Sequence, residues 1–338
     1  MKVLENYSLK NYNTFGLDVK ARWYAEITNT EDLQLLLKNP EFNTTPKMIL
    51  GGGSNILFTK DYEGLIIRNR IEFIKKLSED ENQVSIKVGA GMNWHSFVLY
   101  TIDQNYPGLE NLSLIPGCVG ATPIQNIGAY GVEVKHTFHE LNAVNLSDGS
   151  LQTFKAEECD FGYRDSIFKQ TAKNKYAIVD VTFHFNKNNS LNTSYGAIED
   201  QLKIMNITNP GIRDISNAVI AIRKSKLPDP EIIGNAGSFF KNPEIPEDLF
   251  KNLEQKFPGI VGHQSVNGKI KLASGWLIEQ CGWKGKRIGN TGMHERQALV
   301  LVNYGGATGK ELIDHALRVK ESVLEKFGVE LEMEVNII

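Results

Sequence analysis

The stretch from Ile115 to Gly131 constrains the fold of this chain more than any other part of its sequence. It contains four glycines and two prolines, and it sets two amide side chains, Gln125 and Asn126, among apolar residues. Backbone of this composition leaves many polar groups without partners inside the chain, so it is unfavourable as a simple connection. We therefore expect the chain to fold so that a planar, polar group lies against this stretch.

A glycine triplet, Gly51–Gly53, follows the strand-like run Met48–Leu50. Backbone without side chains can approach a pyrophosphate closely and donate several N–H groups to it, and the next residues, Ser54 and Asn55, add side-chain donors. A glycine triplet alone is more often a tight turn than a phosphate loop. Neither this triplet nor Gly89–Trp94 has the glycine spacing of a Rossmann fingerprint, which disfavours a nicotinamide cofactor held by a Rossmann domain.

Short strand-like runs separated by glycine, asparagine and aspartate turns dominate residues 21–185, and one helix is predicted at Asn93–Gln104. The turn residues Thr208–Gly211 interrupt this pattern, and apolar residues at helical spacing follow from Ile212 to Ile222. We expect this helix to open a second domain of an α+β protein. A chain of 338 residues has room for two or three such domains.

The C-terminal part adds a buried strand at Ala298–Val302 and a helix that starts at a capping box, Thr308–Glu311, and ends at Gly328. The capping box also explains a weak likeness to a phosphate-binding P-loop, because Glu311 occupies the place of the magnesium-binding hydroxyl residue. The closing residues Leu331–Ile338 alternate with period two, which predicts a strand with its two glutamates on one face.

The composition excludes several functional classes. The formal net charge is -3 and 23% of the residues are charged, so there is no basic excess for binding nucleic acid or an anionic membrane. No apolar run reaches the length of a signal peptide or a membrane span, and we expect a cytoplasmic protein. The three cysteines have no paired spacing, and His136 and His139 lack a third ligand, so neither disulfides nor a metal site are expected.

Several motifs, in the same order along nearly the whole chain, resemble those of the UDP-N-acetylenolpyruvoylglucosamine reductase (MurB) family. Besides the two glycine-rich segments, they are Asn13–Gly16, Phe161–Ser166, Lys226–Pro230, Gly234–Pro243 and Glu332–Val335. The resemblance implies an FAD-binding domain of the p-cresol methylhydroxylase type at residues 1–206, with its core at about 17–187 and subdomains at about 1–70 and 71–206. It implies a substrate-binding C-terminal α+β domain at residues 207–338.

The resemblance also implies a reaction. NADPH reduces bound FAD, and the reduced flavin reduces the enolpyruvyl ether of UDP-N-acetylglucosamine to UDP-N-acetylmuramate, a peptidoglycan precursor. The expected partners are these small molecules, with no obligate protein partner. Two alternatives stay open at this point: a flavin oxidase with the same FAD fold, although no motif for a covalent flavin tether is present, and a non-catalytic module that binds nucleotide sugars.

Three residues match the family's catalytic positions: Arg164, Ser238 and Glu334. Hydride addition to an enol ether that is conjugated with a carboxylate produces a dianionic enolate, which needs a cation or a hydrogen-bond donor beside it. A guanidinium suits this charge, and a glutamic acid can donate to it only if its pKa is raised by burial or nearby negative charge. Ser238 is then the proton donor to carbon. Glu332 shares the predicted face of Glu334, so the two acids stay alternatives for one role.

The resemblance assigns further residues to binding. Contacts with FAD are expected at Gly51, Gly52, Gly53, Ser54, Asn55, Ile115, Pro116, Gly117, Thr122, Gln125, Asn126, Gly128 and Ala129. Contacts with the substrate are expected at Tyr130, Tyr195, Lys226, Asn242 and Gln297. Within the second group, the lysine is expected at the pyrophosphate, and Tyr195 on a loop that closes over the phosphates.

Overall fold

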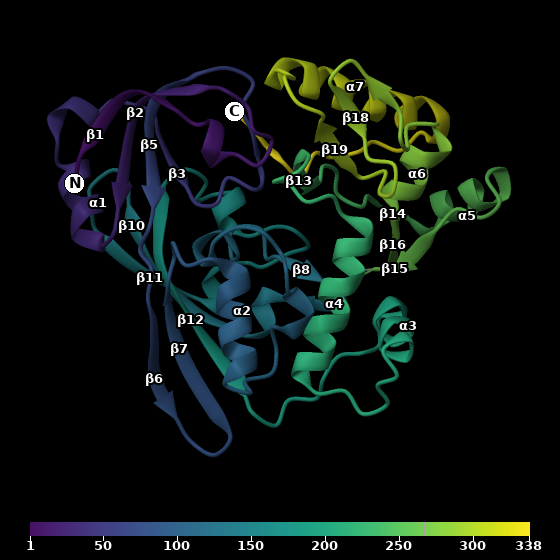
Figure 1. Ribbon diagram of the computed structural model, residues 1–338, viewed down its shortest axis with the longest axis horizontal. Helices are drawn as coiled ribbons and strands as arrows, with labels where there is room; N and C mark the ends of the chain where they lie inside the picture. The colour runs from purple at the N-terminus through teal and green to yellow at the C-terminus, as the bar shows by residue number, and fades with distance from the viewer. Residues whose placement is uncertain (266–267) are drawn as a thin grey trace. The chain divides into compact units, whose positions relative to one another are not determined.

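The structure is a computed structural model that describes residues 1–265 and 268–338 (Figure 1). Contacts within the chain divide it into two compact units. The first unit comprises Met1–Tyr7, Ala21–Gly52 and Tyr62–Ser225, and the second comprises Ser8–Lys20, Gly53–Asp61 and Lys226–Ile338. Each unit is therefore assembled from segments that are far apart in the sequence.

A four-stranded sheet in the order β1-β2-β5-β3 opens the first unit. β5 pairs in parallel with both β2 and β3. Parallel strands present their carboxyl ends at one edge of a sheet, which is where ligands bind in many such folds, and the glycine triplet follows β3 at this edge. The bounds are β1 Val3–Ser8, β2 Lys20–Ile27, α1 Thr30–Leu37, β3 Lys47–Leu50 and β5 Tyr62–Asn69.

An antiparallel five-stranded sheet, in the order β11-β10-β12-β7-β6, forms the larger part of the first unit. Its core includes Trp94 and Phe97 of α2, whose rings contact that of Phe183 in β12. The predicted helix is confirmed, because Asn93 and Gln104 are the caps of α2. The bounds are β6 Ile74–Glu79, β7 Gln83–Gly89, α2 Trp94–Asp103, β8 Gly128–Ala129, β9 Val132–Glu133, β10 Phe138–Asn145, β11 Leu151–Lys155 and β12 Tyr176–Asn186.

Two helices, α3 (Gly196–Ile204) and α4 (Ile212–Lys226), end the first unit and pack against each other. The apolar spacing after residue 211 therefore predicted a helix correctly. The apolar face of α4, which includes Val219, shares one buried cluster with Ile198 of α3, so α4 groups with the first unit as far as Ser225. The domain boundary after residue 206 stays a prediction, and the compact units divide the chain elsewhere.

The second unit contains a four-stranded sheet, β13-β19-β18-β17, and a three-stranded sheet, β14-β16-β15. The N-terminal segments contribute buried side chains to this unit, among them Phe15 and Phe58. Helix α7 has the predicted capping box and ends at Gly328 in the left-handed conformation. The bounds are β4 Ile56–Leu57, β13 Gly234–Ser238, β14 Glu244–Pro246, α5 Glu247–Lys256, β15 Gly262–Gln264, β16 Lys269–Leu272, α6 Ser274–Gln280, β17 Arg287–Ile288, β18 Thr291–Met293, β19 Val300–Asn303, α7 Gly309–Phe327 and β20 Asn336–Ile337.

The strand predicted over Leu331–Ile338 is wrong for most of its length. Only β20 is a strand, paired in parallel with β4, and Met333 makes an isolated bridge with Phe240. The alternating pattern arises because Leu331 and Val335 are buried along an extended segment. This segment contacts Phe240 first and then pairs with β4. Among the described residues, no helix has the length and apolar character needed to cross a lipid bilayer.

Candidate active site

The two glycine-rich segments of the sequence lie side by side in the first unit. A Cβ atom at Gly52 would lie 3.1 Å from the Cα of Gly117, and one at Gly51 would lie 3.5 Å from the Cβ of Cys118. Gly117 has a φ of +119°, which side chains rarely adopt. These residues leave bare backbone at the carboxyl edge of the parallel strands, which is the surface that a pyrophosphate requires. We name this surface, Gly51–Gly52 with Pro116–Gly117, the backbone cradle.

The third glycine of the triplet has a different role. Gly53 belongs to the second unit, and a Cβ atom there would lie 2.0 Å from the carbonyl oxygen of Tyr12. Its own carbonyl oxygen accepts a hydrogen bond of 3.1 Å from the backbone N–H of Thr14. Glycine is therefore required at position 53 by the close approach of another part of the chain, whatever the loop binds.

Some residues expected at the FAD are buried and bonded within the chain. The Asn126 side chain donates to the carbonyl oxygen of Gly162 at 2.9 Å and to the carboxylate of Glu133 at 3.1 Å, and accepts from the backbone N–H of Lys135 at 3.2 Å. The Thr122 hydroxyl donates to a backbone carbonyl at 2.8 Å. These side chains hold the Ile115–Gly131 stretch in shape, and any contact that they make with FAD stays a prediction.

Arg164 has a strained backbone and a fixed side chain. Its φ of +54° lies in the left-handed region, which is uncommon for a residue with a side chain and is often found at functional sites. Its guanidinium donates a hydrogen bond to the carbonyl oxygen of Gly128 and lies 5.3 Å from the ring centroid of Tyr163. The first unit thus brings the predicted catalytic arginine to Gly128, a predicted FAD contact.

Tyr130 and Tyr195, both expected at the substrate, meet in the first unit with ring centroids 5.3 Å apart. Burial raises the pKa of Tyr130, and a hydrogen bond from Arg223 of α4 opposes this shift. The Nε atom of Arg223 is buried and has no hydrogen-bond partner among the described residues. Sequence reasoning missed Arg223, although its spacing of three residues from Lys226 places both on one helix face.

The other two predicted catalytic residues lie close together in the second unit. The backbone N–H of Glu334 donates to the carbonyl oxygen of Phe239 at 2.8 Å, directly beside Ser238 in β13. The carbonyl oxygen of Glu334 accepts from the side chain of Asn55 at 3.3 Å. Glu332 is exposed and makes an ion pair of 2.5 Å with Lys241, so its carboxylate already has a cation as partner.

The Asn13–Gly16 motif supports the same strand. A Cβ atom at Gly234 would lie 2.4 Å from the carbonyl oxygen of Phe15, and the backbone N–H of Asn235 donates to the carbonyl oxygen of Thr14 at 3.0 Å. The side chain of Asn303 also donates to Phe15, at 2.8 Å. Two motifs that are more than 200 residues apart in the sequence therefore fold together and position the strand that carries the predicted proton donor.

The remaining predicted substrate contacts belong to the second unit. The side-chain oxygen of Asn242 accepts from the backbone N–H of Ser274 at 3.0 Å, at the start of α6. The side-chain oxygen of Gln297 accepts from Leu299 at 3.4 Å. Lys226 is exposed at the end of α4. Both amides therefore have structural bonds through their oxygens, and their contacts with substrate stay predictions.

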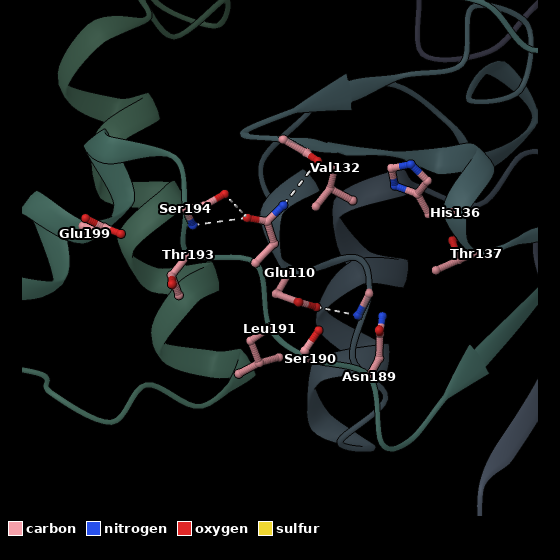
Figure 2. Close-up of a pocket in the computed structure, with 13 residues that line it drawn as sticks. Glu110, Val132, His136, Thr137, Asn189, Ser190, Leu191, Thr193, Ser194 and Glu199 are labelled. Carbon is pink, nitrogen blue, oxygen red and sulfur yellow. Dashed lines mark hydrogen bonds between the residues drawn. The ribbon is translucent and has the colours of Figure 1, made fainter.

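A cavity of about 650 Å³ in the first unit contains none of the predicted site residues (Figure 2). It lies beside the segment that leads to Tyr195, and its lining includes Leu191, Asn192 and Ser194. Its position suggests a role in the placement of that segment. Among residues 1–265 and 268–338, no group of three or more His, Cys, Asp or Glu side chains could hold a metal ion.

Comparisons with known proteins identify both parts of the chain. A family model described as the C-terminal domain of UDP-N-acetylenolpyruvoylglucosamine reductase matches residues 229–338, and one described as an FAD binding domain matches residues 21–155. The UDP-N-acetylenolpyruvoylglucosamine reductase of Flavobacterium johnsoniae is 49% identical over 339 residues, and that of Amoebophilus asiaticus is 51% identical over 338 residues. Both matches cover 100% of this chain and 100% of the relative.

A solved structure supports the same assignment at the level of fold. The crystal structure of UDP-N-acetylenolpyruvylglucosamine reductase (MurB) from Thermus caldophilus aligns with a TM-score of 0.66 and 23% sequence identity. The alignment covers 99% of this chain and 98% of that chain. The predicted α+β fold, with an FAD-binding domain and a C-terminal domain of this type, is confirmed.

Proposed function

The chain belongs to the family of UDP-N-acetylenolpyruvoylglucosamine reductases, and we propose that Arg164, Ser238 and Glu334 carry out the reduction in this member. It is an FAD-containing, NADPH-dependent oxidoreductase of peptidoglycan precursor synthesis. Its substrate is the enolpyruvyl ether of UDP-N-acetylglucosamine, and its product is UDP-N-acetylmuramate. The relatives, which match over the full length of the chain, favour this activity over the flavin oxidase and the non-catalytic module.

The backbone cradle fits the pyrophosphate of FAD. A side chain at Gly52 would meet the backbone of Gly117, and Gly117 has a φ that side chains rarely adopt, so both glycines are needed for the close approach of the two segments. We propose that the cradle, with Ser54 and the Ile115–Ala129 stretch, holds the cofactor. Bound there, FAD would supply the hydride, provided by NADPH, that the methylene carbon of the substrate receives.

Arg164 and Glu334 have the chemistry to stabilise the negative charge that develops on the substrate. Addition of hydride to the methylene carbon pushes an electron pair from the carbon–carbon double bond into the carboxylate, which makes a dianionic enolate. The guanidinium of Arg164 remains charged and offers two parallel N–H donors to that carboxylate. Glu334 in its protonated form would donate a further hydrogen bond, and for this its pKa must be raised when substrate is bound.

Ser238 is proposed to complete the reaction by giving its hydroxyl proton to the carbon that carries the ether oxygen. The enolate electron pair forms the new carbon–hydrogen bond, and solvent returns a proton to the serine oxygen. The observation that most supports this set of residues is the backbone hydrogen bond from Glu334 to Phe239, because it brings the backbone of Glu334 close to that of Ser238 within one unit. It also favours Glu334 over Glu332, because the backbone N–H that is bonded beside Ser238 is that of Glu334.

The Ser238→Ala variant tests the proposal. Reduction of bound FAD by NADPH should keep its rate, whereas oxidation of the reduced flavin by the enolpyruvyl substrate should slow by at least ~100-fold, because a general acid contributes about that factor or more. Stopped-flow absorbance of the flavin measures both half-reactions. Ser150→Ala, which removes an exposed turn hydroxyl, is the matched control. Equal slowing of both half-reactions in Ser238→Ala would contradict the role of proton donor.

The location of the enzyme follows from its small-molecule partners. UDP-sugars and NADPH carry several negative charges and do not cross a lipid bilayer unaided. We propose that the enzyme meets them in the cytoplasm and acts there without an obligate protein partner. Cell fractionation tests this, with the enzyme located in each fraction by an antibody and by an NADPH oxidation assay. Activity that sediments with membranes would contradict the proposal.

A further inference from the structure

The segment that carries Tyr195 borders a cavity and has little apolar packing of its own. Residues 190–195 lead into α3, and Figure 2 shows Leu191, Thr193 and Ser194 on one side of the cavity, with Val132 across from them. Leu191 packs against two apolar clusters, but Ser194 and Tyr195 are exposed. Apolar contacts therefore hold the start of the segment, and something else must position its end.

Asn111 supplies the first of these additional contacts. Its side-chain amide donates one hydrogen bond to the carbonyl oxygen of Asn192 at 2.9 Å and another to that of Tyr130 at 3.0 Å. Because both partners are carbonyl oxygens, only the amide nitrogen can face them, and the direction of the amide is determined by chemistry. One fully buried side chain thus connects the backbones of the two segments that carry the facing tyrosines.

The side-chain oxygen of Asn111 indicates that its two hydrogen bonds have a role beyond stability. Its Oδ1 atom is buried and has no hydrogen-bond partner among the described residues. A buried polar atom without a partner destabilises the folded chain, and an apolar residue of similar shape would avoid that loss. Its neighbours Leu109 and Leu112 lie in the large core of the first unit, so the amide projects from a rigid support.

Asn192 completes the connection. Its side-chain nitrogen donates to the carbonyl oxygen of Gly131 at 3.3 Å, next to Tyr130. Its side-chain oxygen accepts from the backbone N–H of Ser194 at 3.2 Å and from the Ser194 hydroxyl at 2.8 Å, which forms a tight turn immediately before Tyr195. At Gly131 a Cβ atom would lie 3.0 Å from the Asn192 nitrogen, so the approach is close.

We propose that Asn111 and Asn192 are positioning residues that hold Tyr195 against Tyr130 and thereby set the affinity for the UDP-sugar substrate. The proposal rests on the substrate contact proposed for Tyr195. Neither asparagine is expected to touch the reacting atoms. Their loss should therefore weaken substrate binding and leave the limiting rate of flavin oxidation unchanged, because the chemical step depends on other residues.

The test is a double-mutant cycle with Asn192→Ala and Tyr195→Ala. Asn192 is only partly buried, so the variant should fold; FAD content and thermal melting verify this. In stopped-flow titrations of the reduced enzyme with the enolpyruvyl substrate, Asn192→Ala should raise the apparent Kd about 5- to 10-fold, the effect of about one hydrogen bond. The limiting rate should change by less than about twofold. Asn192→Asp keeps the turn with Ser194 and should have a smaller effect.

The double variant tells whether Asn192 acts through Tyr195. If it does, the Kd of the double variant should exceed that of Tyr195→Ala by less than about twofold. The reason is that the side chain that Asn192 positions is already absent from Tyr195→Ala. Asn189→Ala changes another asparagine at the same cavity and is the matched control, with an unchanged Kd expected. Asn111→Ala should behave as Asn192→Ala does.

Two results would overturn the inference. The first is that Asn192→Ala leaves the Kd unchanged while Tyr195→Ala raises it, which would leave the proposed function intact. The second is that the effects of Asn192→Ala and Tyr195→Ala multiply in the double variant, which would mean that the asparagine acts independently. If Tyr195→Ala itself left the Kd unchanged, the substrate contact proposed for Tyr195 would fail first, and the positioning role would fail with it.

Discussion

A buried histidine in the second unit links folding stability to pH. His315 of α7 is 3% exposed, and its Nδ1 atom lies 2.9 Å from the hydroxyl of Thr291. Its Nε2 atom is buried and has no partner among the described residues. Burial lowers the pKa of His315 to about 4, because the charged imidazolium would lose its hydration. The folded chain therefore holds this ring neutral at a pH where the unfolded chain binds a proton.

The sign of the pH effect follows from this shift. The unfolded histidine has a pKa of about 6.5, so the stabilisation is complete above that pH and is lost as the pH falls toward 4. As the pH falls from 7 to about 4.5, preferential protonation of His315 in the unfolded chain should lower the free energy of unfolding by about 2 to 3 kcal/mol. Urea unfolding of His315→Gln should show a pH dependence that is smaller by this amount. The exposed His263→Gln is the control, and equal pH dependence in both variants would contradict the assignment.

Several site residues could be predicted from the sequence, but not the structural reasons for their identities. Gly51 and Gly52 belong to the backbone cradle, and their contact with a pyrophosphate stays a prediction. Gly53 must be glycine because it lies so close to Tyr12. Asn126 is bonded to Glu133 and Lys135 nearby and to Gly162 of a distant segment, which no local pattern indicates. Arg223 was missed, because its helical spacing from Lys226 does not distinguish it from a solvated charge until its neighbours are known.

At the scale of elements, the start of helix α7 depends on Thr308 for its cap and on Gly309 for its packing. The Thr308 hydroxyl accepts from the backbone N–H of Glu311 at 3.2 Å, and the Glu311 carboxylate accepts from the N–H of Thr308 at 2.7 Å. Gly309 follows, and a Cβ atom there would lie 1.8 Å from the carbonyl oxygen of Phe58. The capping box was recognisable in the sequence, but the requirement for glycine arises from a segment about 250 residues earlier.

Thr308→Ala should lower the free energy of unfolding by about 1 kcal/mol, because it removes the side-chain acceptor for one N–H group at the helix start. Urea unfolding followed by circular dichroism measures this change. Glu325→Ala, an exposed position late in the same helix, is the control and should change stability by less than about 0.5 kcal/mol. A Thr308 variant as stable as this control would mean that the cap contributes nothing.

At the scale of the whole molecule, the second unit depends on segments from the N-terminal part of the chain. Leu9, Phe15, Leu17 and Phe58 are almost fully buried, and all belong to the two short segments that complete this unit. Burial of each large apolar side chain contributes roughly 1.5 to 3 kcal/mol. Together they contribute roughly 6 to 12 kcal/mol, which is comparable with the whole stability of a typical domain, about 5 to 15 kcal/mol.

A fragment of residues 226–338 should therefore fail to fold alone. Circular dichroism should show no cooperative thermal transition for it, and the same is expected of a fragment that starts at the predicted boundary, residue 207. Fusion of residues 8–20 and 53–61 to the fragment through flexible linkers is the control, and it should restore a cooperative transition. Cooperative melting of the bare fragment would show that the N-terminal segments are dispensable for its fold.

The amino-acid sequence alone determined the α+β class, helices α2, α4 and α7, and the family, because these depend on local periodicity, on caps and on ordered motifs. The tertiary structure alone decided which segments belong to each unit, the partners of the closing residues, and the pairing of the two asparagines near Tyr195. The physical reason is that these features arise from contacts between residues far apart in the chain, and no local pattern specifies which distant segment fills a given space.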